Sequence, residues 1–107
     1  MNEPASGPRR FRSLPRVRLA GGRAVPVATS RLARLLGLAL LDAGNAGNGL
    51  LIPRCCAVHT VGMRFALDLH FLDSRGQPVA VRRAVGPRRF AFEAHARSVL
   101  EVPSGAS

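Results

Sequence analysis

Apolar and polar side chains alternate along the second half of the chain with the period of two that is typical of β-strands. The alternation is cleanest at 65–72. One face of this segment carries Phe65, Leu67, Leu69 and Phe71, and the other carries Ala66, Asp68 and His70. The pattern therefore predicts a strand whose four large apolar side chains face a hydrophobic core.

Short apolar segments bounded by turn-forming residues predict further strands. They lie at 17–19, 24–28, 50–52, 55–61, 79–85, 89–93 and 98–102. The connections are short: Asp73 and Gly76, for example, occupy the first and fourth positions of a predicted β-turn. Strands joined in this way must be mostly antiparallel, because a parallel crossover takes about a dozen residues or more. We therefore expect seven or eight short antiparallel strands.

One segment, at 29–41, has the period of a helix instead. Thr29 or Ser30 is suited to cap its N-terminus, and Gly37 inside it costs about 1 kcal/mol relative to alanine. The apolar stripe consists of Leu32, Leu35, Leu36, Ala39 and Leu40. The expected fold class is therefore mainly β (α+β): a small antiparallel β-sandwich or partly closed barrel with one amphipathic helix.

The charge of the chain favours anionic partners. All sixteen basic residues are arginines, and with six acidic residues they give a net charge of +10 over 107 residues. Guanidinium groups form bidentate contacts with carboxylates and phosphates. A GC-rich genome, which favours arginine, alanine, glycine and proline together, explains the same bias without any partner. The length allows one domain, and an apolar fraction of 47% suffices for its core.

The first residues combine arginine with proline and glycine. We therefore predict a flexible basic tail at 1–15, followed by a single domain at 16–107. Such a tail would suit nucleic acid or an anionic membrane surface. Phe11 is its one aromatic residue, and the chain has no Trp or Tyr, so base stacking gains little support there. Nucleic acid stays open as a partner, but a solvated tail is the simpler interpretation.

No secretory signal or membrane span is predicted. The basic start is not followed by a long apolar stretch, and the apolar run at 35–41 is too short to cross a bilayer. We therefore expect a soluble, cytoplasmic protein. Cys55 and Cys56 are adjacent, a spacing that disfavours a disulfide between them, so we expect small buried thiols.

The approach to the strand at 65–72 holds the main candidate binding site. Its residues are His59, Thr60, Met63, Arg64 and Asp68. Arg64 and Asp68 can meet only if the chain turns between them, which would make 55–61 and 67–72 a hairpin. In one interpretation these two residues tie down the turn through backbone hydrogen bonds. In the other, Arg64 binds an anionic group in a pocket that His59 and Thr60 help to form.

Metal or thiol chemistry has less support. Cys55, Cys56 and His59 resemble half of a zinc site, but His70 and His95 do not supply the second pair of ligands. A nucleophilic cysteine activated by His59 is disfavoured, because residues four apart on a straight strand lie about 13 Å apart. We therefore predict no metal and no cofactor.

Several motifs resemble those of one known family. Residues 59–68 read His-Thr-Val-Gly-Met-Arg-Phe-Ala-Leu-Asp, and 71–73 read Phe-Leu-Asp. This is similar to the H-T-x-G-M-R-F-P-I-D and F-L-D signature of the domain-of-unknown-function family 192, an uncharacterised family of bacteria and archaea. The motifs R-x-x-G-L at 34–38, G-L-L at 49–51 and V-L-E at 99–101 also agree. The likeness covers roughly residues 16–105.

The chain departs from the family pattern at three places. Ala66 stands where the family usually has proline, and Cys56 stands where a basic residue is common. Many members continue with another helix and strand where this chain stops just after Gly105, so the resemblance implies a short form. The family implies a compact, mainly β fold and no established activity.

Three functions compete on this basis. The leading expectation is a binding module that takes a small anionic ligand or an acidic protein partner at the cluster of His59 and Arg64. A hydrolase-like enzyme would use His59 and Asp68 as acid and base, but no motif for a nucleophile, metal or phosphate loop supports it. An arginine-driven nucleic-acid binder is the third, and a steep loss of affinity with salt would reveal it.

Overall fold

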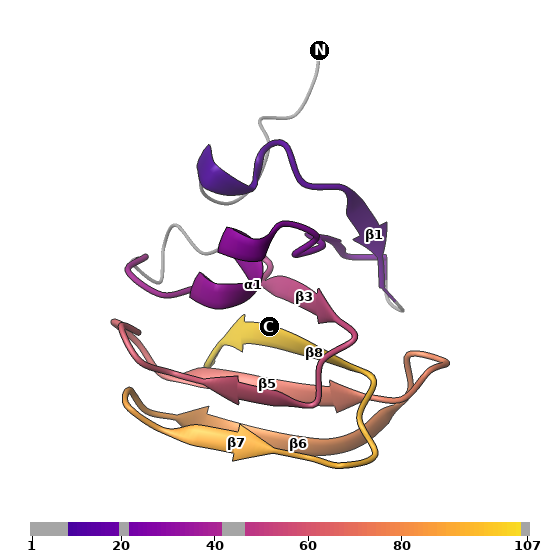
Figure 1. The fold of residues 1–107 in the computed structure, drawn as a ribbon, viewed down its shortest axis with the longest axis vertical. Coiled ribbons are helices and arrows are strands. Elements are labelled where there is room, and N and C mark those ends of the chain that lie inside the picture. Colours follow the sequence, from indigo (N-terminus) through magenta and orange to yellow (C-terminus); the bar gives the residue numbers. More distant parts are fainter. Residues whose placement is uncertain (1–8, 20–21, 42–46, 106–107) are drawn as a thin grey trace.

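The computed structural model describes residues 9–19, 22–41 and 47–105. Within these ranges the fold is mainly β, with antiparallel sheets, one short α-helix and no closed barrel (Figure 1). The predicted fold class is confirmed. In chain order the elements are the 3-10 helix η1 (Arg9–Phe11), β1 (Arg16–Arg18), β2 (Ala24–Pro26), α1 (Arg31–Leu36), β3 (Leu50–Pro53), β4 (Ala57–His59), β5 (Leu67–Leu72), β6 (Pro78–Val85), β7 (Phe90–Phe92) and β8 (Ser98–Pro103).

The strands form three sheets. The largest has the order β3-β8-β5-β6, so β8 and β5 are its central strands. Two separate antiparallel pairs, β1 with β2 and β4 with β7, complete the fold. In Figure 1, α1 lies beside β3, and β7 lies with β6 at the opposite end of the molecule. The hairpin between 55–61 and 67–72, which was the condition for Arg64 and Asp68 to meet, does not form, because β4 pairs with β7 while β5 pairs with β6 and β8.

Strand β5 forms the centre of the core, as its alternation predicts. Leu67, Leu69 and Phe71 are fully buried, and Phe65 packs against the same cluster from the turn before the strand. Burying side chains of this size stabilises a fold by about 1.5–3 kcal/mol each. The period of two in the sequence therefore identified the core face of this strand correctly.

The helix differs from the prediction in length. Ser30 is the N-cap, and its hydroxyl accepts a hydrogen bond from the backbone N–H of Ala33 at 3.0 Å. The helix ends after six residues at Gly37, whose φ of 54° and ψ of −127° leave the helical path. The predicted helix at 29–41 is therefore wrong beyond residue 36. Of the residues that the structure describes, no helix is long and apolar enough to cross a membrane.

The apolar stripe predicted for the helix is also wrong. Three of its leucines are exposed: Leu32, Leu35 and Leu40. The side chains that this segment buries are those of Ala33, Leu38 and Ala39, and of these only Ala39 belongs to the predicted stripe. The early end of the helix explains the failure for Leu40, since a helical period assigns faces only while the helix continues, whereas Leu32 and Leu35 lie within α1 and are exposed there.

Part of the predicted basic tail packs on the domain. Phe11 is only 1% exposed and belongs to the hydrophobic core, as does Leu14. Arg10 donates hydrogen bonds to the backbone carbonyls of Gly37 at 2.7 Å and Ala39 at 2.8 Å. A flexible tail would make none of these contacts, so the prediction does not hold for residues 10–14. Residues 1–8 lie outside the described part of the chain.

Candidate functional site

The structure separates the members of the predicted cluster. Met63 is part of the hydrophobic core, and Arg64 is exposed. Thr60 is buried at the end of β4, where its hydroxyl donates to the carbonyl of Gly86 at 2.7 Å and accepts from the N–H of Arg89 at 2.8 Å. Thr60 therefore fastens the connection between β6 and β7.

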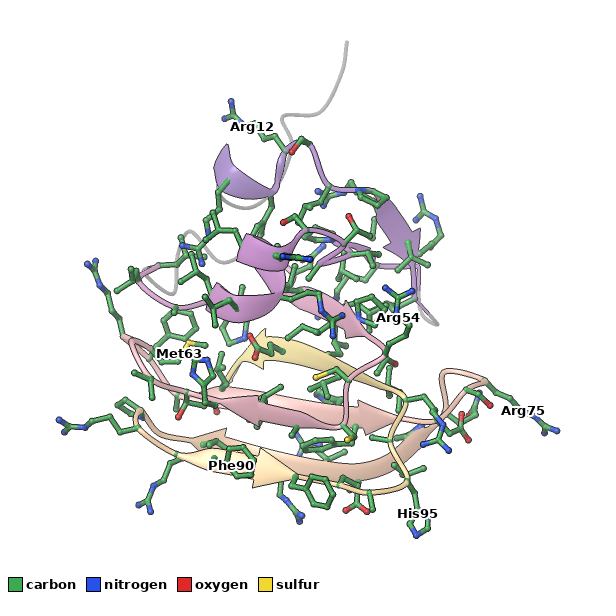
Figure 2. All side chains as sticks on the ribbon, viewed as in Figure 1. Arg12, Arg54, Met63, Arg75, Phe90 and His95 are labelled. Carbon is green, nitrogen blue, oxygen red and sulfur yellow. The ribbon has the colours of Figure 1, made fainter. Side chains whose placement is uncertain are left out.

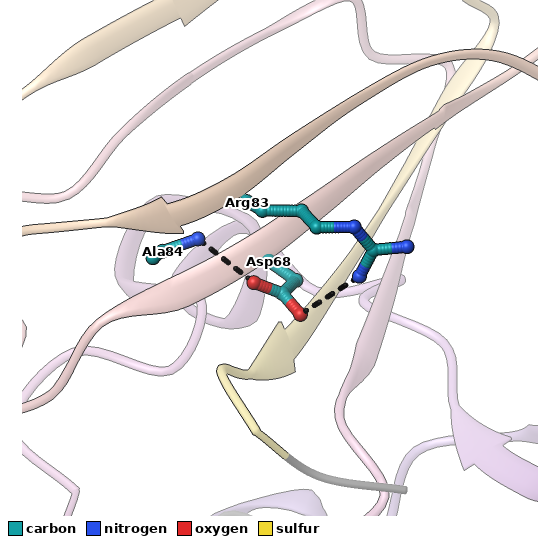
Figure 3. Close-up of polar contacts among 3 residues, drawn as sticks. All are labelled: Asp68, Arg83 and Ala84. Carbon is teal, nitrogen blue, oxygen red and sulfur yellow. Dashed lines mark hydrogen bonds and ion pairs between the residues drawn. The ribbon is translucent and has the colours of Figure 1, made fainter.

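Asp68 stabilises an irregularity in the sheet. The β5–β6 register shifts between Leu67 and Leu69, where Ala84 on β6 has a positive φ of 53°. The Asp68 carboxylate accepts a hydrogen bond from the Ala84 N–H at 2.8 Å and forms an ion pair with Arg83 at 3.4 Å (Figure 3). A bulge leaves backbone donors without their ladder partners, and Asp68 satisfies one of them. Asp68 therefore has a structural role, as one of the two interpretations of the sequence has it, but its partners come from β6.

His59 lines a pocket that the sequence did not reveal. The pocket has a volume of about 50 Å³ and lies where the C-terminal end of α1 meets β3, β4 and β8. Its polar side chains are those of Arg34, Cys55, His59 and Glu101. Its apolar walls include Leu35, Leu36, Ile52 and Val58. The pocket brings together residues from four separate segments of the chain.

Glu101 is the unusual member of this set. It pairs with Leu50 on β3 and Leu69 on β5, so its carboxyl group starts from the core face of the central strand β8 and is only 2% exposed. Its Oε1 accepts a hydrogen bond from the Leu38 N–H at 3.1 Å. Within the described residues this is its one hydrogen bond. Burial raises the pKa of Glu101 to about 7, although the bond from Leu38 opposes the shift.

Gly37 makes room for this carboxyl group. A Cβ placed on Gly37 would lie 2.5 Å from Oε1 of Glu101, well inside van der Waals contact. The positive φ of Gly37 also belongs to a region that side chains rarely adopt. The end of helix α1 and the placement of Glu101 therefore depend on each other.

The other polar groups of the pocket are mainly donors. Arg34 donates to the carbonyl oxygens of Pro53 and Arg54, which uses two of its five N–H groups. Nδ1 of His59 accepts from the backbone N–H of Val61 at 3.2 Å, so in the neutral ring the proton lies on Nε2. A protonated Glu101 adds an O–H donor. Together these groups match a ligand atom that accepts hydrogen bonds.

Cys55 contributes a neutral thiol. Its Sγ donates to the carbonyl of Ala57 at 3.0 Å, and burial raises the pKa of the thiol, with the Arg34 guanidinium opposing this in part. Both cysteines are free and half-buried. Among the residues with assigned positions, no group of three His, Cys, Asp or Glu side chains is arranged to hold a metal ion.

Two features of the sequence mark residues of this pocket. Glu101 shares its parity with Val99 on the last strand, and Val99 is fully buried, so the alternation already assigned a carboxyl group to the core face. Gly37 interrupts the only helical pattern. Neither signal shows that the two residues meet, because that contact joins distant parts of the chain.

Comparison with known proteins agrees with the motifs. No curated protein and no solved structure gives a significant match. The family model DUF192, described as an uncharacterized ACR, matches residues 17–107, which include every strand from β2 to β8 and the whole pocket. The chain therefore belongs to the DUF192 family.

Proposed function

We propose that this protein is a small-ligand binding module that takes a small anionic group, such as a carboxylate, into the pocket of Arg34, His59 and Glu101. The observation that carries the proposal is the buried carboxyl group of Glu101, which lines the pocket with only one hydrogen bond from the described residues. A carboxyl group is costly to bury, and at the wall of a pocket a ligand or a water molecule can complete its hydrogen bonding. The site thus differs from the predicted cluster, of which it retains His59.

The donors of the pocket favour an anion. The Arg34 guanidinium is a cationic donor, and in the neutral ring the proton on Nε2 makes His59 a donor too. With a pKa of about 7, Glu101 is protonated in roughly half of the molecules at neutral pH. A bound carboxylate would accept from all three groups and would hold the proton on Glu101. Binding is therefore coupled to proton uptake.

The size of the pocket limits what enters it. About 50 Å³ holds one or two water molecules or a single small functional group. Ile52 and Val58 supply apolar contacts beside the polar groups, and Leu35 is exposed at the same pocket. A ligand with an anionic end and a short apolar body fits this lining better than a phosphate ester or a large anion.

The hydrolase alternative has weaker geometry. It requires His59 and Asp68 to act on one substrate, but Asp68 does not line the pocket that contains His59. Both oxygens of Asp68 already bind Ala84 and Arg83. A binding module needs no such pair.

Titration with sodium acetate, followed by backbone amide shifts in NMR spectra, tests the proposal. We expect saturable shifts at Leu38, His59 and Glu101, and none of this pattern with ethylammonium chloride. Arg34→Gln should weaken acetate binding about tenfold or more, the loss of a charged hydrogen bond. Arg75→Gln, which removes the same charge from an exposed turn, should leave it unchanged. Equal effects of the two variants, or tighter binding of ethylammonium, would contradict the proposal.

A further inference from the structure

Two phenylalanines of this protein lie on the surface. Phe90 is 72% exposed and Phe92 is 53% exposed, whereas Phe11 and Phe71 are buried in the core. Both are on β7, two residues apart, so they share the outer face of the strand about 7 Å from each other. Figure 2 shows Phe90 standing on this face. Exposed aromatic rings of this size commonly mark a contact surface.

A groove lies beside these rings. It is an open depression of about 400 Å³ between β6 and β7, here called the β6–β7 groove. Its lining consists of Arg82, Ala84, Val85, Gly86, Arg89, Phe90, Ala91 and Phe92. Within the described residues, β6 pairs only with β5 and β7 only with β4, so both strands present a free edge.

The groove is positively charged. Arg82 is balanced by Glu93 at 3.7 Å, but the described part of the chain gives no ion pair to Arg89, which also lines the groove, or to its neighbour Arg88. Thr60 holds the backbone on both sides of this connection through its bonds to Gly86 and Arg89. The arginines thus start from a fixed piece of backbone, which lowers the entropy lost when they bind a ligand.

We propose that the β6–β7 groove binds single-stranded nucleic acid. Proteins that bind single strands without sequence preference combine aromatic side chains, on which bases stack, with a cationic groove that follows the phosphates. Phe90 and Phe92 supply two adjacent stacking surfaces, and Arg82 and Arg89 lie along the same strand edges. The net charge of +10 adds a long-range attraction for the polyanion. Phosphates supply the missing counter-charge for Arg88 and Arg89.

This surface is distinct from the pocket of Arg34, His59 and Glu101, and neither proposal depends on the other. In Arg88-Arg89-Phe90-Ala91-Phe92 two aromatic residues follow two arginines, whereas the N-terminal residues contain Phe11 alone. A surface that serves only a protein partner would use the same exposed rings but would not bind a simple oligonucleotide. Oligonucleotide binding therefore separates the two kinds of partner.

Fluorescence anisotropy with a labelled thymidine oligonucleotide of about 12 nucleotides, a length that one such site covers, gives the first measurement. The full chain should bind it, with an affinity that falls steeply between about 50 and 200 mM salt. Replacing both rings (Phe90→Ala with Phe92→Ala) should weaken binding about fivefold or more per ring. Leu32→Ala, which removes an exposed apolar side chain from α1, is the matched control and should have no effect.

The contribution of the arginines is tested with a matched pair of variants as well. Arg89→Gln should weaken binding more than Arg75→Gln, which removes the same charge at the tip of the β5–β6 turn, far from Phe90 in Figure 2. Equal losses would mean that net charge alone attracts the oligonucleotide, and the assignment to this groove would be wrong. Absence of binding at the lower salt concentration would overturn it too.

A tryptophan probe locates the contact even if the alanine variants fold poorly. The chain contains no Trp or Tyr, so Phe90→Trp introduces its only strong fluorophore. Stacked bases should quench this emission as the oligonucleotide is added, while a Leu32→Trp control should stay unquenched. Quenching of neither variant, or of both equally, would show that nucleic acid does not bind at β7.

Discussion

Gly37→Ala tests whether the early end of α1 and the burial of Glu101 depend on each other. The added methyl group would lie 2.5 Å from Oε1 of Glu101, so the carboxyl group must move. Alanine at this backbone conformation costs about 1–3 kcal/mol in strain. If Leu38 loses its acceptor, an unsatisfied buried N–H costs about 1–3 kcal/mol more. We therefore expect a total loss of about 2–6 kcal/mol, a large part of the ~5–15 kcal/mol stability of a domain.

Gly76→Ala is the matched control for this substitution. Gly76 also has a positive φ, of 79°, but a Cβ there would meet no atom within 4 Å. It therefore carries the backbone strain without the collision. Urea unfolding followed by circular dichroism measures both variants. If Gly37→Ala loses no more stability than Gly76→Ala, the contact with Glu101 does not determine the end of the helix, and the reasoning is wrong.

Two further predictions concern the N-terminal residues and the buried carboxyl group. Phe11→Ala should lower the free energy of unfolding by about 3–5 kcal/mol because it empties a core position; a melting temperature within about 2 °C of the parent would restore the flexible-tail interpretation. Glu101 has a folded pKa of about 7 against an ordinary 4.5, so the folded state holds its proton more tightly and stability should fall as pH rises from about 4.5 to 7. The difference amounts to about 3 kcal/mol, and Glu101→Gln should lack it; equal pH profiles in urea unfolding would refute this.

The sequence predicted what depends on local patterns. Alternation at 65–72 identified the core face of β5, and turn residues identified antiparallel connections. The helix prediction failed because Gly37 and Glu101 meet through the tertiary fold, and no local pattern carries that contact. The composition of the N-terminal residues also gave a wrong prediction of flexibility for residues 10–14. Two apolar side chains among many arginines, Phe11 and Leu14, are enough to anchor this segment in the core.

The candidate site was predictable only in part. His59 belongs to the pocket, but its position before a predicted strand does not show that Arg34 and Glu101 lie beside it. Asp68 looked like a partner for Arg64 because the two are close in sequence, whereas the pairing of β5 with β6 brings Arg83 and Ala84 to it instead. Glu101 lies in an apolar strand, where one carboxyl group among buried positions marks a candidate site.

The pH dependence of acetate binding tests the central claim most directly. If the anion binds only the protonated form of Glu101, the affinity should fall about tenfold between about pH 6 and pH 8, since the pKa is about 7 and acetate stays ionised throughout. Glu101→Gln keeps a donor of the same size without the titration, so its affinity should stay nearly constant. Affinity that rises with pH, or a tenfold fall that persists in Glu101→Gln, would contradict the account.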